Sequence, residues 1–323
     1  MTGSLILAIP SKGRLKEQVE AWLEDCGLTL RSAGGARGYQ ATLEGFGDVQ
    51  VRLASAGDIA RSLVAGDVHL GVTGEDLLGE AFSTTGGDFL MLLALGFGRA
   101  DLVVAAPKSW LDVETMADVD DVAHHHLLRT GRRLRVATKY LSQTRAFFDR
   151  HGVSDYRIVE SGGATEGAPA AGAAELVVDI TTSGATLAAN GLKVIVDGLI
   201  LRSEARLAAS LRAEWGPDRL ACCRRFLTIL EARARGRTIA SLAWPGDQHE
   251  VARAVAAPFA QSDEPVSQHG VLVAQSELFA AALALGAAGV GPLSVTHPAY
   301  VFIQASPAAD RLEAALSRIE PVG

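Results

Sequence analysis

Between Glu166 and Asn190, the acidic residue Asp179 lies close to a run of small residues, three of which carry hydroxyl groups. The hydrophobic segment Glu175 to Ile180 has the composition of a buried strand and carries Asp179 near its carboxyl end. A turn of small residues follows, made of Thr181, Thr182, Ser183, Gly184 and Ala185. A helix is expected to begin at Thr186. Small residues let backbone N–H groups approach a phosphate, hydroxyl groups add donors, and a helix N-terminus adds a partial positive charge. The segment therefore predicts an anion-binding turn.

The carboxylate of Asp179 would repel a phosphate held by this turn, so its position needs an explanation. A carboxylate can accept hydrogen bonds from two neighbouring hydroxyl groups of a sugar. The length of the turn would then place a 5-phosphate one ribose away from the acid. The alternative is a plain helix cap, with Asp179 as a solvated strand end. The spacing of the acid and the turn favours a sugar-phosphate site.

Basic residues and glycines also accompany other predicted strands. Ser11 to Arg14 reads Ser-Lys-Gly-Arg and directly follows the apolar run Leu5 to Ile9, and Gly71 to Asp76 reads G-V-T-G-E-D. Arg52 lies in a third predicted strand, and Gly96 to Arg99 lies where the chain is expected to cross between sheets. Each segment alone is compatible with a solvated loop, a helix cap or a plain turn. Open α/β sheets bind ligands at the carboxyl ends of their strands, so their order along the chain favours ligand contacts.

Short apolar runs alternate with helical patterns through most of the chain. After Leu5 to Ile9, strands are predicted at 51–54, 69–73, 102–106, 134–138 and 175–180. This alternation predicts an α/β fold with mostly parallel sheets. Two further strands, 193–196 and 199–201, are expected to return to the first sheet.

The last third of the chain predicts a small α+β domain. A helix over 217–235 ends in the basic stretch ARARGRT, which is typical of a linker. Strands are then predicted at 238–243, 270–274 and 300–304, each followed by an alanine-rich helix, and Ser306-Pro307 is a good start for the last one.

Composition limits the classes of function. The 323 residues carry a formal net charge of -7, which argues against a nucleic-acid or anionic-membrane surface. Any binding of phosphate groups must then depend on a local cluster of basic residues. Three cysteines cannot build a disulfide framework, and the first residues lack the apolar run of a signal peptide or membrane span, so a cytoplasmic protein is expected. The run His124-His125-His126 lacks partners at metal spacing and predicts a surface loop or helix start rather than a zinc site.

The run E-G-A-P-x-x-G-x-A-x-x-x-x-D-x-x-x-x-G-x-T-L-x-x-N, which begins at Glu166, resembles the signature of the ATP phosphoribosyltransferase family. Residues 1 to about 225 follow that family's order of motifs. The resemblance implies that Asp179 holds the ribose hydroxyls of phosphoribosyl diphosphate and that Glu166 lies on the same side. It implies that the 5-phosphate is bound by Thr182, Ser183, Gly184, Ala185 and Thr186. It implies an ATP side made of Lys12, Gly13, Arg14, Arg52, Gly74 and Asp76, with Asp179, Arg14 and Lys12 as the catalytic groups.

The same resemblance implies a two-lobe core like that of a periplasmic binding protein. Residues 1–100 and 185–225 would form lobe one, 101–184 lobe two with the phosphoribosyl diphosphate turn, and 237–323 a C-terminal domain for regulation or assembly. The implied reaction, the first step of histidine biosynthesis, is attack by N1 of ATP on the anomeric carbon, with release of diphosphate and help from Mg²⁺. A neutral ring nitrogen needs no activated serine or cysteine. The specific metal ligands are unknown.

Some features depart from the family pattern and leave alternatives open. Glu175 and His69 stand where the family usually has Asp, and the tail lacks a Pro-Thr-Val-like motif, so direct inhibition by histidine through 237–323 is in doubt. The alanine-rich tail helices make a homo-oligomer plausible, and a separate regulatory subunit is open. The rival classes are a non-enzymatic two-lobe solute-binding or sensing protein and another phosphoribosyltransferase. The latter usually carries two adjacent acids before the turn, whereas Val178 precedes Asp179 here.

Overall fold

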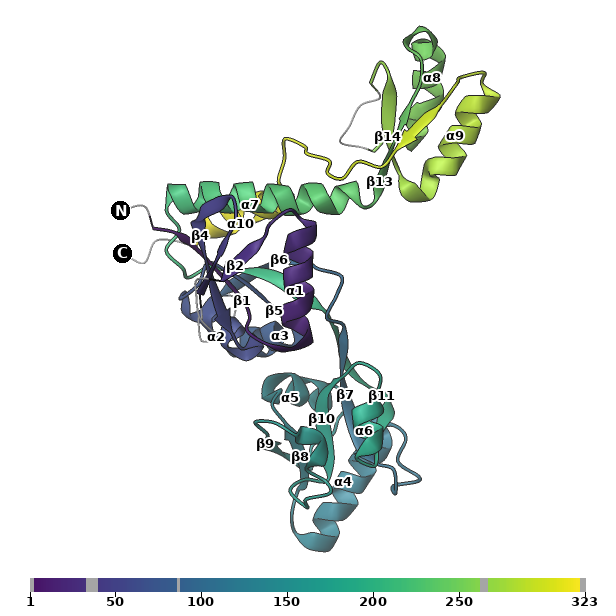
Figure 1. Cartoon of the computed structure of the whole chain (residues 1–323). Helices are drawn as coiled ribbons and strands as arrows, with labels where there is room; N and C mark the ends of the chain where they lie inside the picture. The colour runs from purple at the N-terminus through teal and green to yellow at the C-terminus, as the bar shows by residue number, and fades with distance from the viewer. Residues whose placement is uncertain (1–2, 33–39, 86–87, 262–266, 320–323) are drawn as a thin grey trace. The chain divides into compact units, whose positions relative to one another are not determined.

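The computed structural model describes residues 3–32, 40–85, 88–261 and 267–319 (Figure 1). The chain divides into two compact units, an N-terminal unit of residues 1–219 with 312–323 and a C-terminal unit of residues 220–311. Among the helices described, none combines the length and the apolar character needed to cross a membrane.

The first lobe of the N-terminal unit is built on a seven-stranded sheet of order β2-β3-β4-β1-β5-β12-β6. Its strands are β1 (Leu5–Pro10), β2 (Leu30–Ser32), β3 (Gln40–Leu43), β4 (Phe46–Ala54), β5 (Leu70–Gly74), β6 (Phe89–Ala94) and β12 (Ala205–Ser210). Its helices are α1 (Gly13–Asp25), α2 (Ala56–Ala65) and α3 (Glu75–Thr85). β1 lies parallel to β4 and β5 at the centre, and its apolar side chains are almost all buried, as its sequence predicts.

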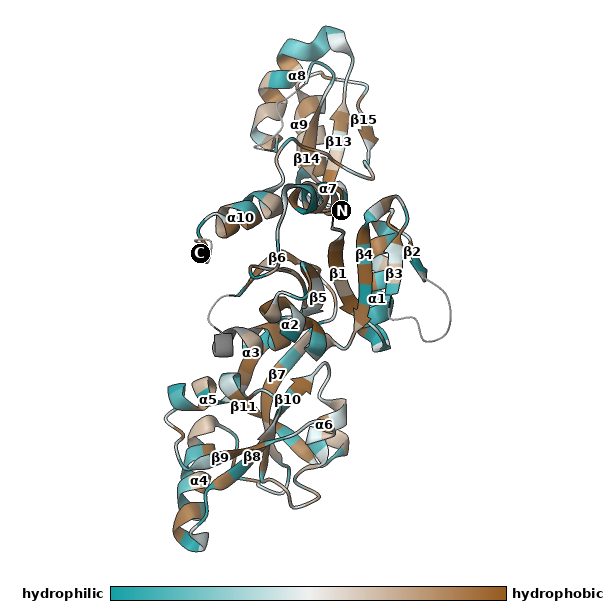
Figure 2. Cartoon of the chain, turned by 90° about the vertical axis from the view of Figure 1, so that its left-hand side faces the viewer, coloured by the Kyte–Doolittle hydropathy of each residue, from teal (hydrophilic) through white to brown (hydrophobic). Residues whose placement is uncertain are grey.

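The second lobe is built on a five-stranded sheet of order β11-β7-β10-β8-β9. Its strands are β7 (Ala100–Pro107), β8 (Leu134–Thr138), β9 (Tyr156–Glu160), β10 (Leu176–Thr181) and β11 (Leu192–Ser203). Its helices are α4 (Met116–Thr130), α5 (Leu141–Arg150), the short α6 (Ala185–Ala189) and the single 3-10 turn η1 (Thr165–Gly167). The central strands of the two sheets, β1 and β10, are hydrophobic and largely buried, as their brown colour in Figure 2 illustrates. The predicted α/β core with two sheets is confirmed. The expectation of mostly parallel sheets is wrong, because both sheets also contain antiparallel pairs, such as β12 with β5 and β7 with β10.

The chain crosses between the lobes twice, but the second crossing lies later than the sequence predicts. The expectation that 193–196 and 199–201 return to the first sheet is wrong, because both belong to the single strand β11, which pairs with β7 in the second sheet. The pairing shifts register between Val194 and Leu199, and a side chain at Gly198 would collide with Ile195 and Val104. This irregularity makes one long strand look like two in the sequence. Residues 185–203 therefore belong to the second lobe, and β12 is the strand that returns.

The C-terminal unit has its own antiparallel sheet, of order β14-β13-β15. Its strands are β13 (Ile239–Ala243), β14 (Gly270–Ala274) and β15 (Ser294–Thr296), and α8 (His249–Ala256) and α9 (Leu278–Ala287) pack against them around a buried apolar cluster. Short 3-10 turns complete it: η2 (Gly246–Gln248), η3 (Ala257–Phe259) and η4 (Gln275–Glu277). This is the small α+β fold predicted for the tail.

Two details of the tail differ from the prediction. The strand expected at 300–304 is absent among the described residues, because this segment lies along helix α7 (Pro217–Gly236) instead: Val301 N–H donates to the Ala232 carbonyl at 2.9 Å. The compact unit also begins at Leu220 rather than at 237, so most of α7 is part of it. The last helix, α10, spans Pro307–Leu316, and the buried Glu231 of α7 accepts from Ser306 Oγ and Ala308 N at its start.

Candidate active site

A cavity of about 660 Å³ in the N-terminal unit collects residues that follow the carboxyl ends of strands in both lobes. It is lined by Arg14, Leu15, Gln18, Ala56, Gly74, Asp76, Leu77, Gly96, Phe97, Gly98, Arg99, Ala100, Lys139, Ile180 and Thr182. Four predicted site residues therefore meet here, namely Arg14, Gly74, Asp76 and Thr182. The Gly96 to Arg99 segment lines the cavity as well.

The loop after β1 presents two cations beside this cavity. Gly13 has a φ of 78°, a left-handed conformation that favours glycine, and it begins α1 directly after the extended Lys12. Lys12 and Arg14 are exposed, and within the described part of the chain neither side chain has a hydrogen-bond or salt-bridge partner. Arg14 lines the cavity and Lys12 does not. Unpaired cations at this position are available to bind an anionic ligand.

Asp179 lies near the end of β10, half-buried, with a carboxylate oxygen 2.8 Å from the N–H of Ile180. Burial raises the pKa of Asp179, and the neighbouring carboxylates of Glu166 and Asp76 act in the same direction, whereas the Ile180 N–H and the Lys139 ammonium lower it. Asp179, Glu166 and Lys139 thus lie within electrostatic reach of one another. Glu166 sits in η1, next to Ala164, whose φ of 49° is unusual for a residue other than glycine.

The turn after β10 is held by its own hydroxyl groups. Gly184 N–H donates to Thr181 Oγ1 at 2.8 Å, and Ala185 N–H lies 3.4 Å from Ser183 Oγ. Gly184 has a φ of 73°, which explains the glycine at this position. Thr182, Ser183 and Thr186 are exposed, and Thr182 alone of the turn lines the cavity. The helix begins at Ala185 rather than at Thr186 and is only five residues long, so it adds less dipole than the sequence suggested.

Asp76, in the first lobe, is almost fully buried and forms hydrogen bonds with residues of the second lobe. Its carboxylate accepts from Tyr140 Oη at 2.5 Å and from Ser203 Oγ at 2.8 Å. A side chain at Gly74 would collide with this carboxylate, which accounts for the second glycine of the G-V-T-G-E-D motif. Burial beside Asp76 raises the pKa of Tyr140, so its hydroxyl stays a donor. Asp76 reaches the cavity wall as part of this buried network.

Arg52 is not brought into the cavity. Its guanidinium donates to the backbone carbonyl of Asp67, in the turn before β5, at 3.1 Å. That turn precedes the amino end of β5, whereas the cavity lies at the carboxyl ends. Sequence reasoning missed Lys139 and Gln18, which line the cavity. The sequence could have indicated Lys139, because this residue directly follows the predicted strand 134–138. Asp179 likewise lies near the carboxyl end of its strand.

The histidine run does not lie where the sequence predicts. His124 to His126 lie inside α4 rather than at a loop or helix start, so that detail of the prediction is wrong, although His124 and His125 are exposed as expected. Among the described residues no group of three or more His, Cys, Asp or Glu side chains is placed to hold a metal ion.

Comparison with known proteins decides the family. The family model of ATP phosphoribosyltransferase matches residues 55–226. The chain belongs to the ATP phosphoribosyltransferase family. It is 61% identical to the ATP phosphoribosyltransferase of Caulobacter vibrioides over 98% of this chain and 99% of that protein, and 47% identical to that of Bradyrhizobium diazoefficiens over 98% and 100%. Among solved structures, the ATP phosphoribosyl transferase (HisG:HisZ) complex from Thermotoga maritima matches with a TM-score of 0.54 and 26% identity, over 70% of this chain and 96% of that one.

Membership of the ATP phosphoribosyltransferase family agrees with the resemblance found in the sequence. It favours a phosphoribosyl-transferring enzyme over a solute-binding or sensing protein with the same two-lobe architecture. It also favours this family over other phosphoribosyltransferases. The relative from Caulobacter vibrioides covers the tail too, so the C-terminal unit is part of the shared length.

Proposed function

We propose that the chain transfers the phosphoribosyl group of phosphoribosyl diphosphate to N1 of ATP, with release of diphosphate, in the cavity between the strand ends of the two lobes. The observation that carries the proposal is that Arg14, Lys139 and Thr182 line one cavity in a member of the ATP phosphoribosyltransferase family. The half-buried Asp179 does not line the cavity itself but directly precedes Ile180, which does. The reaction is the first step of histidine biosynthesis.

The sugar phosphate is held by the second lobe. Asp179 accepts hydrogen bonds from the ribose hydroxyls, and Glu166, the nearby second carboxylate, supports the same sugar. The 5-phosphate lies against the turn made of Thr182, Ser183, Gly184, Ala185 and Thr186. The exposed hydroxyls of this turn are available as donors, and the left-handed Gly184 shapes the backbone around the phosphate.

The first lobe and the crossing segment receive the remaining phosphates. Lys12 and Arg14 have no partner in the described part of the chain and lie at the cavity or next to it, with Gly13 between them. Gly74 and Asp76 form the wall on the ATP side. Arg99, from the crossing segment noted in the sequence, and Lys139, which the sequence analysis missed, supply two further cations. Arg52, bound to the Asp67 carbonyl, is left out of this arrangement.

Catalysis follows from positioning and charge. The nucleophile is a neutral ring nitrogen, so the site must align it with the anomeric carbon opposite the departing diphosphate. Positive charge that develops on the ribose is stabilised by Asp179, and negative charge on the diphosphate by Arg14 and Lys12. Burial disfavours the ionised form of Asp179 and raises its pKa, whereas the Lys139 ammonium opposes this shift. The positive charge of the transition state would favour the ionised carboxylate in the same way.

The donor set fits a Mg²⁺ ion that arrives with the substrate. Mg²⁺ in phosphate-binding sites is usually held by one or two carboxylates together with the phosphates themselves. Asp179 and Glu166 are two carboxylates close enough to influence each other's charge. When bound, Mg²⁺ would neutralise charge on the diphosphate. Asp76 is less suited to this role because its oxygens already accept from Tyr140 and Ser203.

The biological setting is part of the same proposal. A biosynthetic reaction that uses ATP points to the cytoplasm, and we propose a homo-oligomer, with no nucleic acid or membrane among its partners. The matching structure from Thermotoga maritima is a HisG:HisZ complex, which supports a separate regulatory subunit as a partner of this chain as well.

The test is a direct assay of the purified chain with ATP, phosphoribosyl diphosphate and Mg²⁺. Phosphoribosyl-ATP and diphosphate should form in equal amounts. Arg14→Ala should lower kcat/KM by about tenfold to a hundredfold, since a charge-assisted hydrogen bond contributes about 1.5–3 kcal/mol. The matched control is Arg61→Ala, which removes an exposed arginine of α2 that does not line the cavity. Absence of product with the wild-type chain would contradict the proposal.

A further inference from the structure

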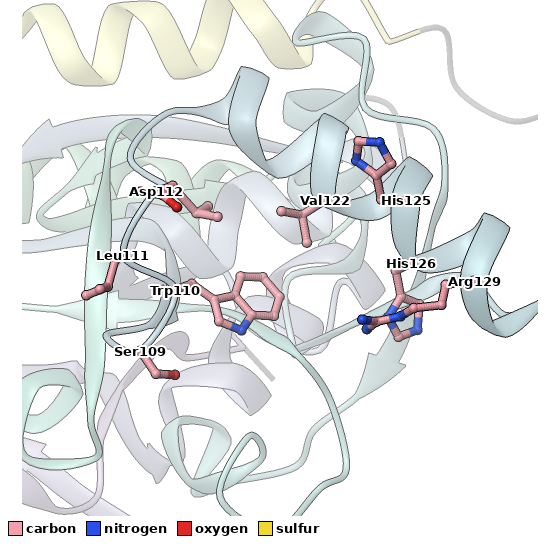
Figure 3. A pocket seen from close by; sticks show the side chains of 9 residues that line it. Ser109, Trp110, Leu111, Asp112, Val122, His125, His126 and Arg129 are labelled. Atoms are coloured by element: carbon pink, nitrogen blue, oxygen red, sulfur yellow. The ribbon is translucent and has the colours of Figure 1, made fainter.

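Two adjoining cavities lie in the second lobe and share no residue with the active-site cavity. The first, of about 530 Å³, is lined by residues that include Trp110, His125, His126 and Arg129 (Figure 3). The second, of about 740 Å³, is lined by His126 together with four arginines and Glu175. His126 lines both cavities, so the two are neighbours.

The helix α4 builds the wall of the first cavity. Met116, Val119 and Ala123 are its buried face and pack into the core of the lobe. A second face carries Val122, His125, His126 and Arg129, which recur at helical spacing and all line the cavity. Figure 3 shows the indole ring of Trp110 on the side opposite this face. Because Trp110 is only partly buried against the core, part of its ring remains open to the cavity.

The second cavity concentrates positive charge. Arg135 is neutralised by Glu175, with an N–O distance of 2.6 Å. Arg132, Arg133 and Arg157 remain exposed, and the described residues offer their side chains no hydrogen-bond or salt-bridge partner. The register of β8 and β9 sets Arg157 directly opposite Arg135.

This arrangement is unfavourable without an anion. Arg135 is paired with Glu175, so the repulsion arises among the three unpaired guanidinium groups of Arg132, Arg133 and Arg157 around one cavity. The chain as a whole has a net charge of -7, so the cluster does not reflect a generally basic surface. A guanidinium group can donate two parallel hydrogen bonds to a phosphate, and the negative charge of a bound phosphate would relieve the repulsion.

We propose that the two cavities together bind one nucleoside di- or triphosphate, at a site distinct from the active site. The base would stack on Trp110, and the phosphates would lie among Arg132, Arg133 and Arg157. An aromatic face next to a cationic cavity matches a ligand that has a ring at one end and phosphates at the other. Asp112, which also lines the first cavity, is available to accept from a ribose hydroxyl or an amino group of the base.

The position of the cluster separates it from catalysis. Arg132 and Arg133 precede the amino end of β8, whereas Lys139, which lines the active-site cavity, follows the carboxyl end of the same strand. The two sites therefore lie at opposite ends of the strands of the second sheet.

The proposal is tested by titrating ADP into the full chain in a calorimeter, without phosphoribosyl diphosphate, so that no turnover occurs. The double variant Arg132→Ser, Arg133→Ser should lose one class of ADP sites present in the wild type, or weaken it at least about tenfold. Arg150→Ser removes an exposed arginine of the same lobe outside both cavities and should leave the titration unchanged. Superimposable titrations of the wild type and the double variant would overturn the proposal, whatever the active-site cavity binds.

A second comparison tests whether the base is recognised. Trp110→Leu should weaken the same class of ADP sites about tenfold, because stacking of a base on an aromatic ring contributes about 1–3 kcal/mol. It should leave binding of inorganic triphosphate within about twofold of the wild type. If ADP and triphosphate bind alike and Trp110→Leu changes neither, the cluster binds inorganic phosphates only, and the nucleotide site is refuted.

Discussion

At the scale of single residues, Asp179 combines two opposing requirements. Its carboxylate has to lie near a sugar to bind hydroxyl groups, yet burial in the second lobe raises its pKa. A carboxyl whose pKa is higher in the folded chain than in the unfolded chain contributes stability below its unfolded pKa. That contribution is lost as the pH rises through the folded pKa. The ionised form of Asp179 that the proposed function requires is therefore unfavourable for folding at a pH above its raised pKa.

Asp179→Asn should separate these two effects. The amide removes the charge and can still accept the Ile180 N–H, so the melting temperature at pH 7 should rise by about 1–3 °C. The gain should shrink as the pH is lowered through the raised pKa of the wild-type carboxyl, because the wild-type residue then becomes neutral as well. The same variant should lose about tenfold to a hundredfold in kcat/KM for phosphoribosyl diphosphate. Thermal melts across this pH range and steady-state kinetics check both parts. A less stable variant with normal kinetics would contradict the role given to Asp179.

Local sequence patterns predicted the candidate residues that lie at a strand end or in the turn after it. Asp179, Gly184 and Arg14 follow from local patterns, because a strand end, a left-handed glycine and a basic loop can be recognised in a short window. Arg52 and Lys139 depend on the direction in which a side chain leaves its strand and on the element that lies next to it. Arg52 reaches back to the Asp67 carbonyl, and Lys139 reaches the cavity through the packing of β8 beside β10. Such neighbours are set by tertiary structure.

At the scale of elements, α3 and α5 join the two lobes by polar contacts. Helix α5 has no side-chain cap of its own, and Glu80 of α3 accepts from the N–H groups of Ser142 and Gln143 at 2.8 and 3.1 Å. A carboxylate from a neighbouring helix thus satisfies the first turn of α5 and complements its dipole. Gln143 in turn donates to the carbonyl of Asp76 at 2.7 Å. The contact links α5 of the second lobe to the Gly74–Asp76 segment, which lines the cavity.

Removing this cap should weaken the chain measurably. Glu80→Ala is expected to lower the free energy of unfolding by about 1–2 kcal/mol, as for loss of an N-cap, and Glu80→Gln by less, because the amide keeps an acceptor. Urea unfolding of both variants gives the difference. Glu17→Ala, an exposed position of α1, serves as the matched control and should stay within about 0.5 kcal/mol of the wild type. Equal midpoints for Glu80→Ala and Glu17→Ala would argue against the cap.

The same scale explains which strands the sequence could and could not assign. Buried strands such as β1, β8 and β10 are short apolar runs, so they can be recognised from the local sequence alone. β11 is interrupted at Gly198 by an irregular pairing, and its sheet is chosen by its antiparallel partner β7, which no local pattern specifies. The strand expected at 300–304 has suitable residues, but its backbone is satisfied by α7 instead of by a sheet.

At the scale of the whole molecule, each compact unit has a core of its own. The second lobe packs around Leu176, which is fully buried, and the C-terminal unit packs around Leu242, which is also fully buried. Units that bury separate apolar clusters can unfold separately, since the loss of one core does not by itself expose the other. The chain passes from one unit to the other between Arg219 and Leu220, and again after Arg311.

We therefore expect thermal unfolding in two transitions, each sensitive to its own core. Leu242→Ala should lower the transition of the C-terminal unit and leave the other in place, whereas Leu176→Ala should do the reverse. Each truncation removes the same buried atoms and should cost about 2–5 kcal/mol in its own unit. Differential scanning calorimetry of the wild type and the two variants at one protein concentration measures both transitions. A single transition shifted equally by both substitutions would mean that the two cores unfold as one cooperative unit, and the division of the chain at Leu220 would then have no thermodynamic counterpart.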